Sequence, residues 1–307
     1  MSDKIKIGTR GSKLALWQTH FVAGVLNKAG IQTEILAIET KGDKLLGQAF
    51  AEIGTKGIFT EELEEKLVAG ELDIAVHSAK DMQTQLPEGL EIIAFTKREE
   101  PNDVLVSLDP DFKFKNSPEV LIGTSSTRRR AMLKYYYPEV KVADARGNLQ
   151  TRFRKMEEGQ FKAMILAYAG VHRMGFDKYI IEKLPLDKFV PAVGQGSIAI
   201  EASAGLSKSK KDKIRELLNH PETEMILKAE RAFLNRLQGG CSIPAFGMAV
   251  FKGANLSLTG GIADLQGKEL IKLEKSGNSA DGVSMGITLA EEVLDAGGKR
   301  ILSEFKK

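Results

Sequence analysis

Few residues of this chain suit covalent or acid–base chemistry, and the first of them is its single cysteine, Cys241. It follows Gly239 and Gly240, which have no side chains to shield the sulfur, and Pro244 soon after it discourages regular structure. A thiolate is the softest nucleophile among protein side chains, so a lone cysteine on an exposed turn suggests covalent chemistry. A lone cysteine can equally be a small buried apolar residue, and its position alone leaves both interpretations open.

A second candidate is the segment His77-Ser78-Ala79-Lys80-Asp81. It follows an apolar run at 72–76 that is expected to form a strand, and open α/β sheets place their ligand-binding residues at the carboxyl ends of strands. Asp81 beside Lys80 should be ionised and could hold a proton or face a developing positive charge. A Lys-Asp pair on a turn is also a common surface ion pair, and His77 could be purely structural.

Arginine is concentrated in one stretch of the sequence, at expected loops and helix starts. The residues are Arg128, Arg129, Arg130, Arg146, Arg152 and Arg173, with Arg10 at the matching place nearer the N-terminus. A guanidinium group binds carboxylate or phosphate through two parallel hydrogen bonds. Several such groups around one cleft would suit a ligand with many acidic groups, whereas Arg128 to Arg130 alone could also form a solvated basic face.

The elements that must position these residues alternate between short β-rich runs and helical periods, which is typical of α/β layers. We expect strands at 4–9, 32–39 and 72–76, and helices at 14–26 and 59–69. The connection at 42–57 carries four glycines and is long for a compact domain. It could be a functional lid or an ordinary surface excursion.

The chain contains an internal repeat. The segment 7–13, Ile-Gly-Thr-Arg-Gly-Ser-Lys, recurs at 122–128 as Ile-Gly-Thr-Ser-Ser-Thr-Arg, and each copy follows an expected strand and opens a helix. The segment 70–72, Gly-Glu-Leu, has a looser echo at 159–161, Gly-Gln-Phe. Two similar lobes would then face each other, each offering the amino end of a helix to an anion. Short turns of this kind can also resemble one another by chance.

After 219 the pattern changes to that of a small α+β unit. A helix is expected through 221–237, with Gly239 and Gly240 suited to a left-handed helix end. Strands at 245–251, 256–262 and 269–273 and a helix at 287–294 follow. Cys241 would lie on the loop that leaves the first helix.

The overall composition narrows the class of protein. The chain has 307 residues, 44 basic and 41 acidic, and its net charge of +3 indicates no general affinity for nucleic acid. One cysteine excludes an internal disulfide, and the four scattered histidines form no local metal motif, so no metal is expected. The amino end does not resemble a signal peptide and no apolar run is long enough to span a bilayer, so we expect a cytoplasmic protein with no membrane contact.

Taken together, these segments resemble one family, porphobilinogen deaminase (hydroxymethylbilane synthase), over nearly the whole chain. The matching motifs, in chain order, are Gly8-Thr9-Arg10 with Ser12, Leu14-Ala15-Leu16-Trp17-Gln18, Gly57-Ile58-Phe59, Asp73-Ile74-Ala75-Val76-His77-Ser78 with Lys80-Asp81, Gly123-Thr124-Ser125-Ser126, Arg128-Arg129, Arg146-Gly147-Asn148, Pro191-Ala192-Val193-Gly194-Gln195-Gly196 and Gly239-Gly240-Cys241. Each motif is weak alone, but their order and spacing are very specific.

The resemblance implies a transferase of porphyrin and heme biosynthesis. It would join four porphobilinogen molecules head to tail, release ammonia at each addition, and give hydroxymethylbilane, a linear tetrapyrrole. A dipyrromethane cofactor, itself two porphobilinogen units, would be held by a thioether to Cys241. Asp81 would be the catalytic residue, because a carboxylate beside the pyrrole nitrogens stabilises the cationic azafulvene left when ammonia departs and can relay protons.

The resemblance also places the binding residues. Each pyrrole bears an acetate and a propionate, so basic and hydroxyl side chains would hold the cofactor and the substrate. Those residues would be Arg10, Ser12, Lys56, Phe59, Ser78, Lys80, Thr124, Ser125, Ser126, Arg128, Arg129, Arg146, Arg152, Arg173 and Gln195.

The fold implied by the resemblance is α/β, with two lobes like those of periplasmic binding proteins around a cleft and a small C-terminal α+β domain. The first domain would comprise 1–97 and about 195–216, the second 98–194, and the third, carrying the cofactor-attachment loop, 217–307. We expect a monomer whose partner is the small molecule porphobilinogen.

The chain departs from the family pattern in two places. The motif commonly reads His-Ser-Met-Lys-Asp-Val-Pro, but Ala79 stands here for the methionine, and Met82 and Gln83 stand for the Val-Pro pair. A lysine common a few residues before the Lys-Gly-Ile/Leu-Phe motif appears as Glu52. These changes affect packing and turn stiffness beside Asp81, and a lid contact, but they remove no catalytic charge.

Two other classes of function compete with this interpretation. A non-catalytic two-lobed receptor for a small polyanion would explain the repeat and the arginines, but it gives no role to Cys241 or Asp81. An RNA-binding role is less favoured, because no aromatic residues are interleaved with the arginine cluster.

Overall fold

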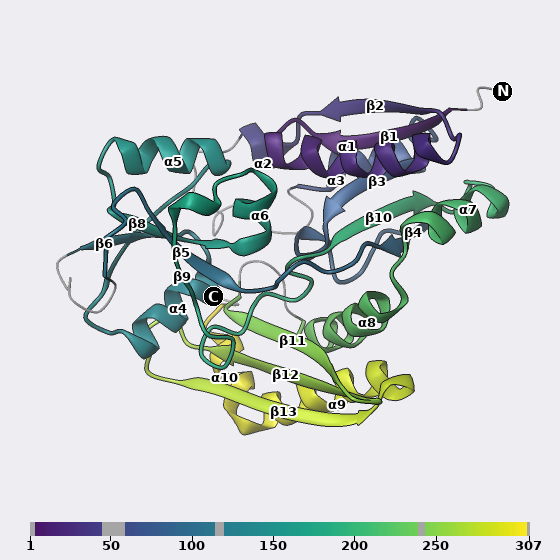
Figure 1. The fold of residues 1–307 in the computed structure, drawn as a ribbon. Coiled ribbons are helices and arrows are strands. Elements are labelled where there is room, and N and C mark those ends of the chain that lie inside the picture. Colours follow the sequence, from purple (N-terminus) through teal and green to yellow (C-terminus); the bar gives the residue numbers. More distant parts are fainter. Residues whose placement is uncertain (1–3, 45–58, 114–119, 239–242, 306–307) are drawn as a thin grey trace.

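The computed structural model describes residues 4–44, 59–113, 120–238 and 243–305, with strands that form three separate sheets (Figure 1). Two of these sheets have five strands each, and the third has three. Helices cover the two larger sheets and pack on the smaller one (Figure 1). This confirms the expected α/β fold class with a small C-terminal α+β unit.

The first sheet has the strand order β2-β1-β3-β10-β4. Its strands are β1 (Ile5–Arg10), β2 (Thr33–Ile38), β3 (Ile74–Ser78), β4 (Leu90–Phe95) and β10 (Ile198–Ser203). β1 is parallel to β2 and β3, whereas β10 runs antiparallel between β3 and β4. The helices of this lobe are α1 (Lys13–Lys28), α2 (Lys41–Lys44), α3 (Glu61–Val68) and α7 (Lys208–Leu218). The expected helix at 59–69 therefore begins two residues later, at Glu61.

The second sheet repeats this plan with the order β7-β6-β8-β5-β9. Its strands are β5 (Asp103–Ser107), β6 (Leu121–Gly123), β7 (Lys141–Ala143), β8 (Ala163–Ala167) and β9 (Ile180–Lys183). β6 is parallel to β7 and β8, and β5 runs antiparallel between β8 and β9. Its helices are α4 (Thr127–Tyr136), α5 (Leu149–Glu157) and α6 (Tyr168–Arg173).

The internal repeat has a direct structural cause. A Cβ atom on Gly8 would lie 2.4 Å from a methyl carbon of Leu72, and one on Gly123 would lie 2.8 Å from the ring of Phe161. The glycine on β1 and the glycine on β6 therefore each make room for the apolar residue of the second repeated segment. Ser12 caps α1 and Ser126 caps α4, each accepting a hydrogen bond from a main-chain amide of the first turn. The two repeats thus build equivalent strand–turn–helix units.

Two segments connect the lobes and lie side by side, one at 96–102 and the other at 190–197. Arg98 donates through Nε to the carbonyl oxygen of Gln195, and the amide of Glu99 donates to the carbonyl oxygen of Gly196. A Cβ atom on Gly196 would lie 2.4 Å from the carbonyl oxygen of Glu99, so only glycine permits this approach. Arg98 also forms an ion pair with the buried Glu230 of the third unit (Nη1–Oε1 2.5 Å), which links the two connecting segments to that unit.

The third unit contains the antiparallel strands β11 (Ala245–Lys252), β12 (Asn255–Ala263) and β13 (Leu270–Asn278). Its helices are α8 (Pro221–Arg236), α9 (Gly282–Val293) and α10 (Lys299–Ser303). After α8, Gln238 has a φ of 53° and takes the left-handed conformation. The expected left-handed helix end at Gly239 and Gly240 stays a prediction. Those two glycines and Cys241 lie outside the described residues.

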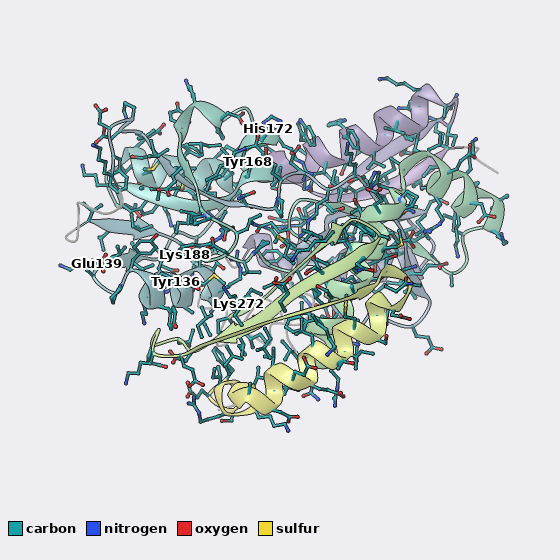
Figure 2. All side chains as sticks on the ribbon, turned by 60° about the horizontal axis from the view of Figure 1, so that its bottom comes forward. Tyr136, Glu139, Tyr168, His172, Lys188 and Lys272 are labelled. Atoms are coloured by element: carbon teal, nitrogen blue, oxygen red, sulfur yellow. The ribbon has the colours of Figure 1, made fainter. Side chains whose placement is uncertain are left out.

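The third sheet also contacts the second lobe. Lys272 of β13 donates through Nζ to the carbonyl oxygen of Asp187 at 2.7 Å, and the Lys188 ammonium lies 6.0 Å from the centre of the Tyr136 ring. Figure 2 shows Tyr136, Lys188 and Lys272 near one another at this junction.

Among the described residues, no helix is both long enough and apolar enough to cross a membrane.

Candidate functional site

A pocket lies where β1 and β3 end, at the carboxyl edge of the first sheet. Its lining residues are Arg10, Ser12, Leu14, Ala15, Gln18, Phe59, Thr60, Val76, His77, Ser78 and Asp81. They come from the turn before α1, the residues before α3, and the end of β3 with its following turn. Five of the expected site residues are therefore brought together here, namely Arg10, Ser12, Phe59, Ser78 and Asp81.

Arg10 forms one wall of this pocket together with Phe59. The guanidinium carbon of Arg10 lies 4.2 Å from the centre of the Phe59 ring, which is a cation–π contact. This contact fixes the plane of the guanidinium group at the pocket wall. A planar cation in this position suits the carboxylate of a ligand.

The turn that carries Asp81 is held from two sides. It is a short 3-10 helix, η1 (Ala79–Asp81), that follows β3 directly, and the amide of Gln18 on α1 donates to the hydroxyl of Ser78 at 3.0 Å. On the other side Gly194 packs so closely that a Cβ atom there would lie 2.9 Å from the carbonyl carbon of Ala79. Asp81 is half-buried and faces the pocket.

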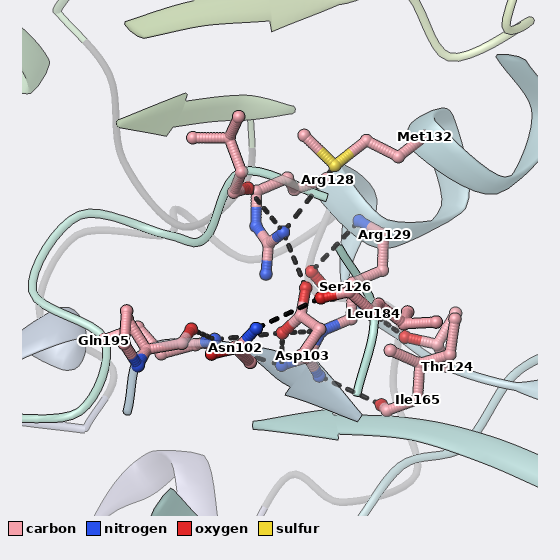
Figure 3. A network of polar contacts seen from close by, with 12 residues as sticks. Asn102, Asp103, Thr124, Ser126, Arg128, Arg129, Met132, Ile165, Leu184 and Gln195 are labelled. Carbon is pink, nitrogen blue, oxygen red and sulfur yellow. Dashed lines mark hydrogen bonds and ion pairs between the residues drawn. The ribbon is translucent and has the colours of Figure 1, made fainter. Parts of the chain in front are cut away.

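Next to this turn, a buried polar network is centred on Asp103, the first residue of β5 (Figure 3). Arg129 donates to Oδ1 of Asp103 from Nη2 at 2.7 Å and from Nε at 3.0 Å, and Gln195 donates to the same oxygen at 2.9 Å. Arg128 forms an ion pair with Oδ2 at 2.8 Å. Lys80 joins the network through the side-chain oxygen of Gln195, at 3.5 Å. Residues of both lobes are therefore linked around one carboxylate.

The network holds more buried positive charge than its carboxylate can balance. Burial opposes ionisation of Asp103, but the charges of Arg128 and Arg129 outweigh it and hold the pKa of that carboxyl well below its usual range. Burial and repulsion by Arg129 lower the pKa of Lys80 to about 8. Burial and repulsion by Arg129 also lower the pKa of Arg152 to about 10. The site therefore favours an anionic ligand on electrostatic grounds alone.

One buried donor of this network has no hydrogen-bond partner within the part of the chain that the structure describes. Nε of Arg128 is buried and donates to no described residue, although Nη1 of the same side chain donates to the carbonyl oxygen of Val190 at 2.9 Å. An unpaired buried donor is costly, and a ligand carboxylate would satisfy it. The residues of this site consequently fit a small molecule with several acidic groups.

The other expected binding residues lie around this network. Arg146 donates to Asp144 at 2.6 Å, and Arg173, the last residue of α6, donates to the carbonyl oxygen of Gly196 at 2.7 Å. Thr124 is buried and accepts a hydrogen bond from the amide of Ser126 through its hydroxyl oxygen. Ser125 lies between them, before α4. Lys56, Cys241 and the variant position Glu52 lie outside the described residues.

Sequence reasoning missed the anchoring carboxylates. Asp103 directly precedes the apolar run Val-Leu-Val of β5. A charged residue at the start of a strand that is expected to be buried indicates a buried ion pair, and this pattern could have identified Asp103. Glu201 is a second case, because it is fully buried in β10 and its Oε2 lies 3.1 Å from Nε2 of His77. Each carboxylate is separated from its partner by more than twenty residues in the sequence, so local spacing could not reveal the pairs.

Within the described residues, no group of three or more acidic, histidine or cysteine side chains could hold a metal ion.

The chain matches known proteins over its full length. Residues 5–211 match the family model described as porphobilinogen deaminase, dipyrromethane cofactor binding domain, and residues 225–295 match the model of the porphobilinogen deaminase C-terminal domain. The chain is 54% identical to the porphobilinogen deaminase of Cytophaga hutchinsonii over all of this chain and 98% of that protein. It is 52% identical to that of Desulfosudis oleivorans over 99% of this chain and 98% of that protein. Among solved structures, the methionine-binding protein MetQ aligns at 13% identity, with a TM-score of 0.45 over 69% of this chain and 88% of that one.

Proposed function

The chain belongs to the porphobilinogen deaminase family, and on this premise we propose which of its residues perform the family's reaction. The enzyme is a transferase of porphyrin biosynthesis that condenses four porphobilinogen molecules head to tail, with release of ammonia, to give hydroxymethylbilane. Its cofactor is dipyrromethane. The observation that carries this conclusion is the match of both family domains, together with more than half of all residues identical to a named relative.

We propose that Cys241 attaches the cofactor through a thioether bond, since it is the only thiol of the chain. The acetate and propionate groups of the cofactor and of the substrate would be held by Lys80, Ser125, Arg128, Arg129 and Arg152. The positive surplus around Asp103 and the unpaired Nε of Arg128 support this assignment. When bound, the cofactor would supply the free pyrrole carbon to which the first substrate is joined.

Asp81 is the proposed catalytic residue. Loss of ammonia from porphobilinogen leaves a cationic azafulvene, and a carboxylate held beside the pyrrole nitrogen stabilises that charge. The same carboxylate can accept the proton that the attacked pyrrole carbon loses once the new carbon–carbon bond has formed. The position of Asp81 at the carboxyl end of β3, facing the pocket, supports both roles.

Arg10, Ser12, Phe59 and Ser78 form the proposed subsite for the substrate side of the pocket. The guanidinium of Arg10 would bind a substrate carboxylate, while Phe59 holds that guanidinium in place. Thr124, Ser126, Arg146, Arg173 and Gln195 would complete the binding surface, and Lys56 is proposed from the family position alone.

For the organisation of the chain, we propose domain boundaries at 1–97 with about 195–216, at 98–194, and at 217–307. Membership of β10 in the first sheet and the crossing segments at 96–102 and 190–197 support these boundaries. We also propose that the enzyme is a cytoplasmic monomer that binds porphobilinogen and no nucleic acid. The near balance of 44 basic and 41 acidic residues supports the last point.

The assay that tests this function follows both products of the reaction. Purified protein supplied with porphobilinogen should release four ammonia molecules for each hydroxymethylbilane formed. A heat-treated sample is the control for spontaneous condensation. Uptake of porphobilinogen without ammonia release would indicate a binding protein and contradict the proposal.

The lowered pKa of Lys80 predicts how substrate affinity changes with pH. Lys80 loses its charge as the pH rises through about 8, whereas an ordinary lysine stays charged to about pH 10. If Lys80 binds a substrate carboxylate, KM should rise up to about tenfold per pH unit above that value. The Lys80→Arg variant should keep KM flat over this range, because arginine stays protonated.

The same titration does not destabilise the fold. Because the pKa of Lys80 is lower in the folded protein than in the unfolded chain, the unfolded chain holds more protons between about pH 8 and 10.5. This group therefore adds stability as the pH rises through that window. A rise in KM without a fall in the melting temperature would support the role of Lys80, and a pH-independent KM in the wild type would contradict it.

A further inference from the structure

The molecule contains a buried carboxylate that the proposed mechanism does not use, Glu64 of α3. Only 3% of its surface is exposed, and among the described residues it forms no ion pair. Its two oxygens instead accept hydrogen bonds from the side-chain amide of Gln83, at 2.8 and 3.1 Å. The same amide lies 3.4 Å from the hydroxyl of Thr60. Gln83 therefore contacts both oxygens of this carboxylate and stabilises it together with Thr60.

The surroundings of Glu64 make that partner important. Burial and the charge of the fully buried Glu201 raise the pKa of Glu64, while hydrogen bonds from Thr60 and Gln83 and the charge of His77 oppose the rise. An unpaired buried carboxylate would be costly. The contact with Gln83 is consequently one that the folded protein is strongly driven to keep.

Gln83 lies two residues after Asp81, and the chain between them is fixed on a second side. The main-chain oxygen of Gln83 accepts a hydrogen bond from Nη2 of Arg231 on α8, at 2.6 Å. Met82 between them is buried and packs with Ala79 in a small apolar cluster. The side chain of Gln83 thus ties the Asp81 turn to α3, and its main chain ties the same turn to α8.

The α3 side of this connection is also a wall of the pocket. Thr60, which contacts Gln83, lines the pocket together with Phe59, and Asp81 lines it from the opposite element. The Gln83 amide therefore bridges the two elements whose separation sets the width of the pocket. The common family motif has proline at this position, whose side chain has no amide to make such a bridge.

We propose that Gln83 is a positioning residue for Asp81, which holds the catalytic turn at a fixed distance from the Phe59–Thr60 wall by donating to Glu64 and Thr60. This inference rests on the proposed role of Asp81. A positioning contact acts on the transition state, so its loss lowers kcat. KM changes little, because the basic side chains that bind the substrate carboxylates are left in place.

The test compares Gln83→Met, which keeps the length of the side chain and removes its amide, with a matched control. The control is Gln160→Met, because the amide of Gln160 donates to Glu158 in an equivalent but exposed contact. We expect kcat to fall between about 10- and 100-fold for Gln83→Met, with KM within twofold of the wild type. Gln160→Met should have wild-type kcat and KM. An unchanged kcat for Gln83→Met would overturn the proposal.

A swap of the two side chains separates positioning from loss of folding. Gln83→Glu alone places two carboxylates face to face and should lower both kcat and the melting temperature. The double variant Gln83→Glu with Glu64→Gln restores a donor opposite an acceptor, and it should recover most of kcat and of the melting temperature. Recovery of the melting temperature without recovery of kcat would show a structural contact only and overturn the proposal.

The double variant Asp81→Ala with Gln83→Met tests whether Gln83 acts through Asp81. Once Asp81 is gone, removal of the Gln83 amide should lower the residual rate no further. A further fall equal to that of the single variant would contradict the inference. If Asp81→Ala alone kept full activity, the proposed catalytic role would fail instead, so the two failures are distinguishable.

Discussion

Replacement of Cys241 by alanine should yield a protein whose intact mass equals that of its amino-acid sequence, whereas the wild type made by a porphobilinogen-producing host should carry two additional pyrrole units. The chain has one cysteine, so no other thiol can take up the cofactor. Because the cofactor provides the site of chain extension, the variant should form no hydroxymethylbilane at a measurable rate. Mass spectrometry of the intact protein and the ammonia assay measure these two results.

A thiol titration of the unfolded wild type provides the control. A thioether persists in denaturant, so the active wild type should show no reactive thiol when unfolded. The number of thiols measured needs no correction, because the chain has no other cysteine. One reactive thiol per chain in fully active enzyme would contradict covalent attachment at Cys241. Retention of the additional mass in Cys241→Ala would contradict it as well.

Asp81→Ala should reduce kcat for condensation by about 10²- to 10⁴-fold, the usual contribution of a positioned acid–base group. The substrate carboxylates bind elsewhere, so KM should change much less. The turn itself is held by the Gln18–Ser78 hydrogen bond and by the close packing of Gly194, neither of which involves the Asp81 carboxylate. The melting temperature should therefore stay near that of the wild type.

Asp295→Ala is the matched control, because Asp295 is an exposed aspartate paired with Lys299 on the C-terminal helices. It should leave kcat and KM unchanged. Cofactor loading of Asp81→Ala is read from the intact mass, so that a loss of rate can be separated from a loss of cofactor. A cofactor-loaded, folded Asp81→Ala enzyme with wild-type kcat would refute the catalytic role.

Much of the fold could be predicted from the sequence because its information is local. The two repeated turns place a glycine, a helix cap and an apolar partner at fixed offsets, and the structure confirms both units. The expected pocket residues Arg10, Ser78 and Asp81 follow the ends of strands, so the rule that ligands bind at the carboxyl ends of strands brings them together.

The contacts of the site that could not be predicted join residues that are distant in the sequence. Asp103 forms ion pairs with Arg128 and Arg129, two arginines expected to bind the ligand. A buried guanidinium group needs a carboxylate from its own protein when no ligand is bound. Gln83 could be recognised as a departure from the family motif, but its partner Glu64 could not, because nothing in a helical pattern marks which glutamate turns inward.

The antiparallel strand β10 has a consequence for the order in which the chain folds. Ala199 of β10 pairs with Phe95 of β4, so completion of the first sheet must wait for a segment about one hundred residues further along the chain. All strands of the second sheet lie between those two residues. During synthesis on the ribosome, the second lobe can therefore close while the first still lacks the antiparallel strand β10. The amino-terminal lobe is then the later of the two to mature.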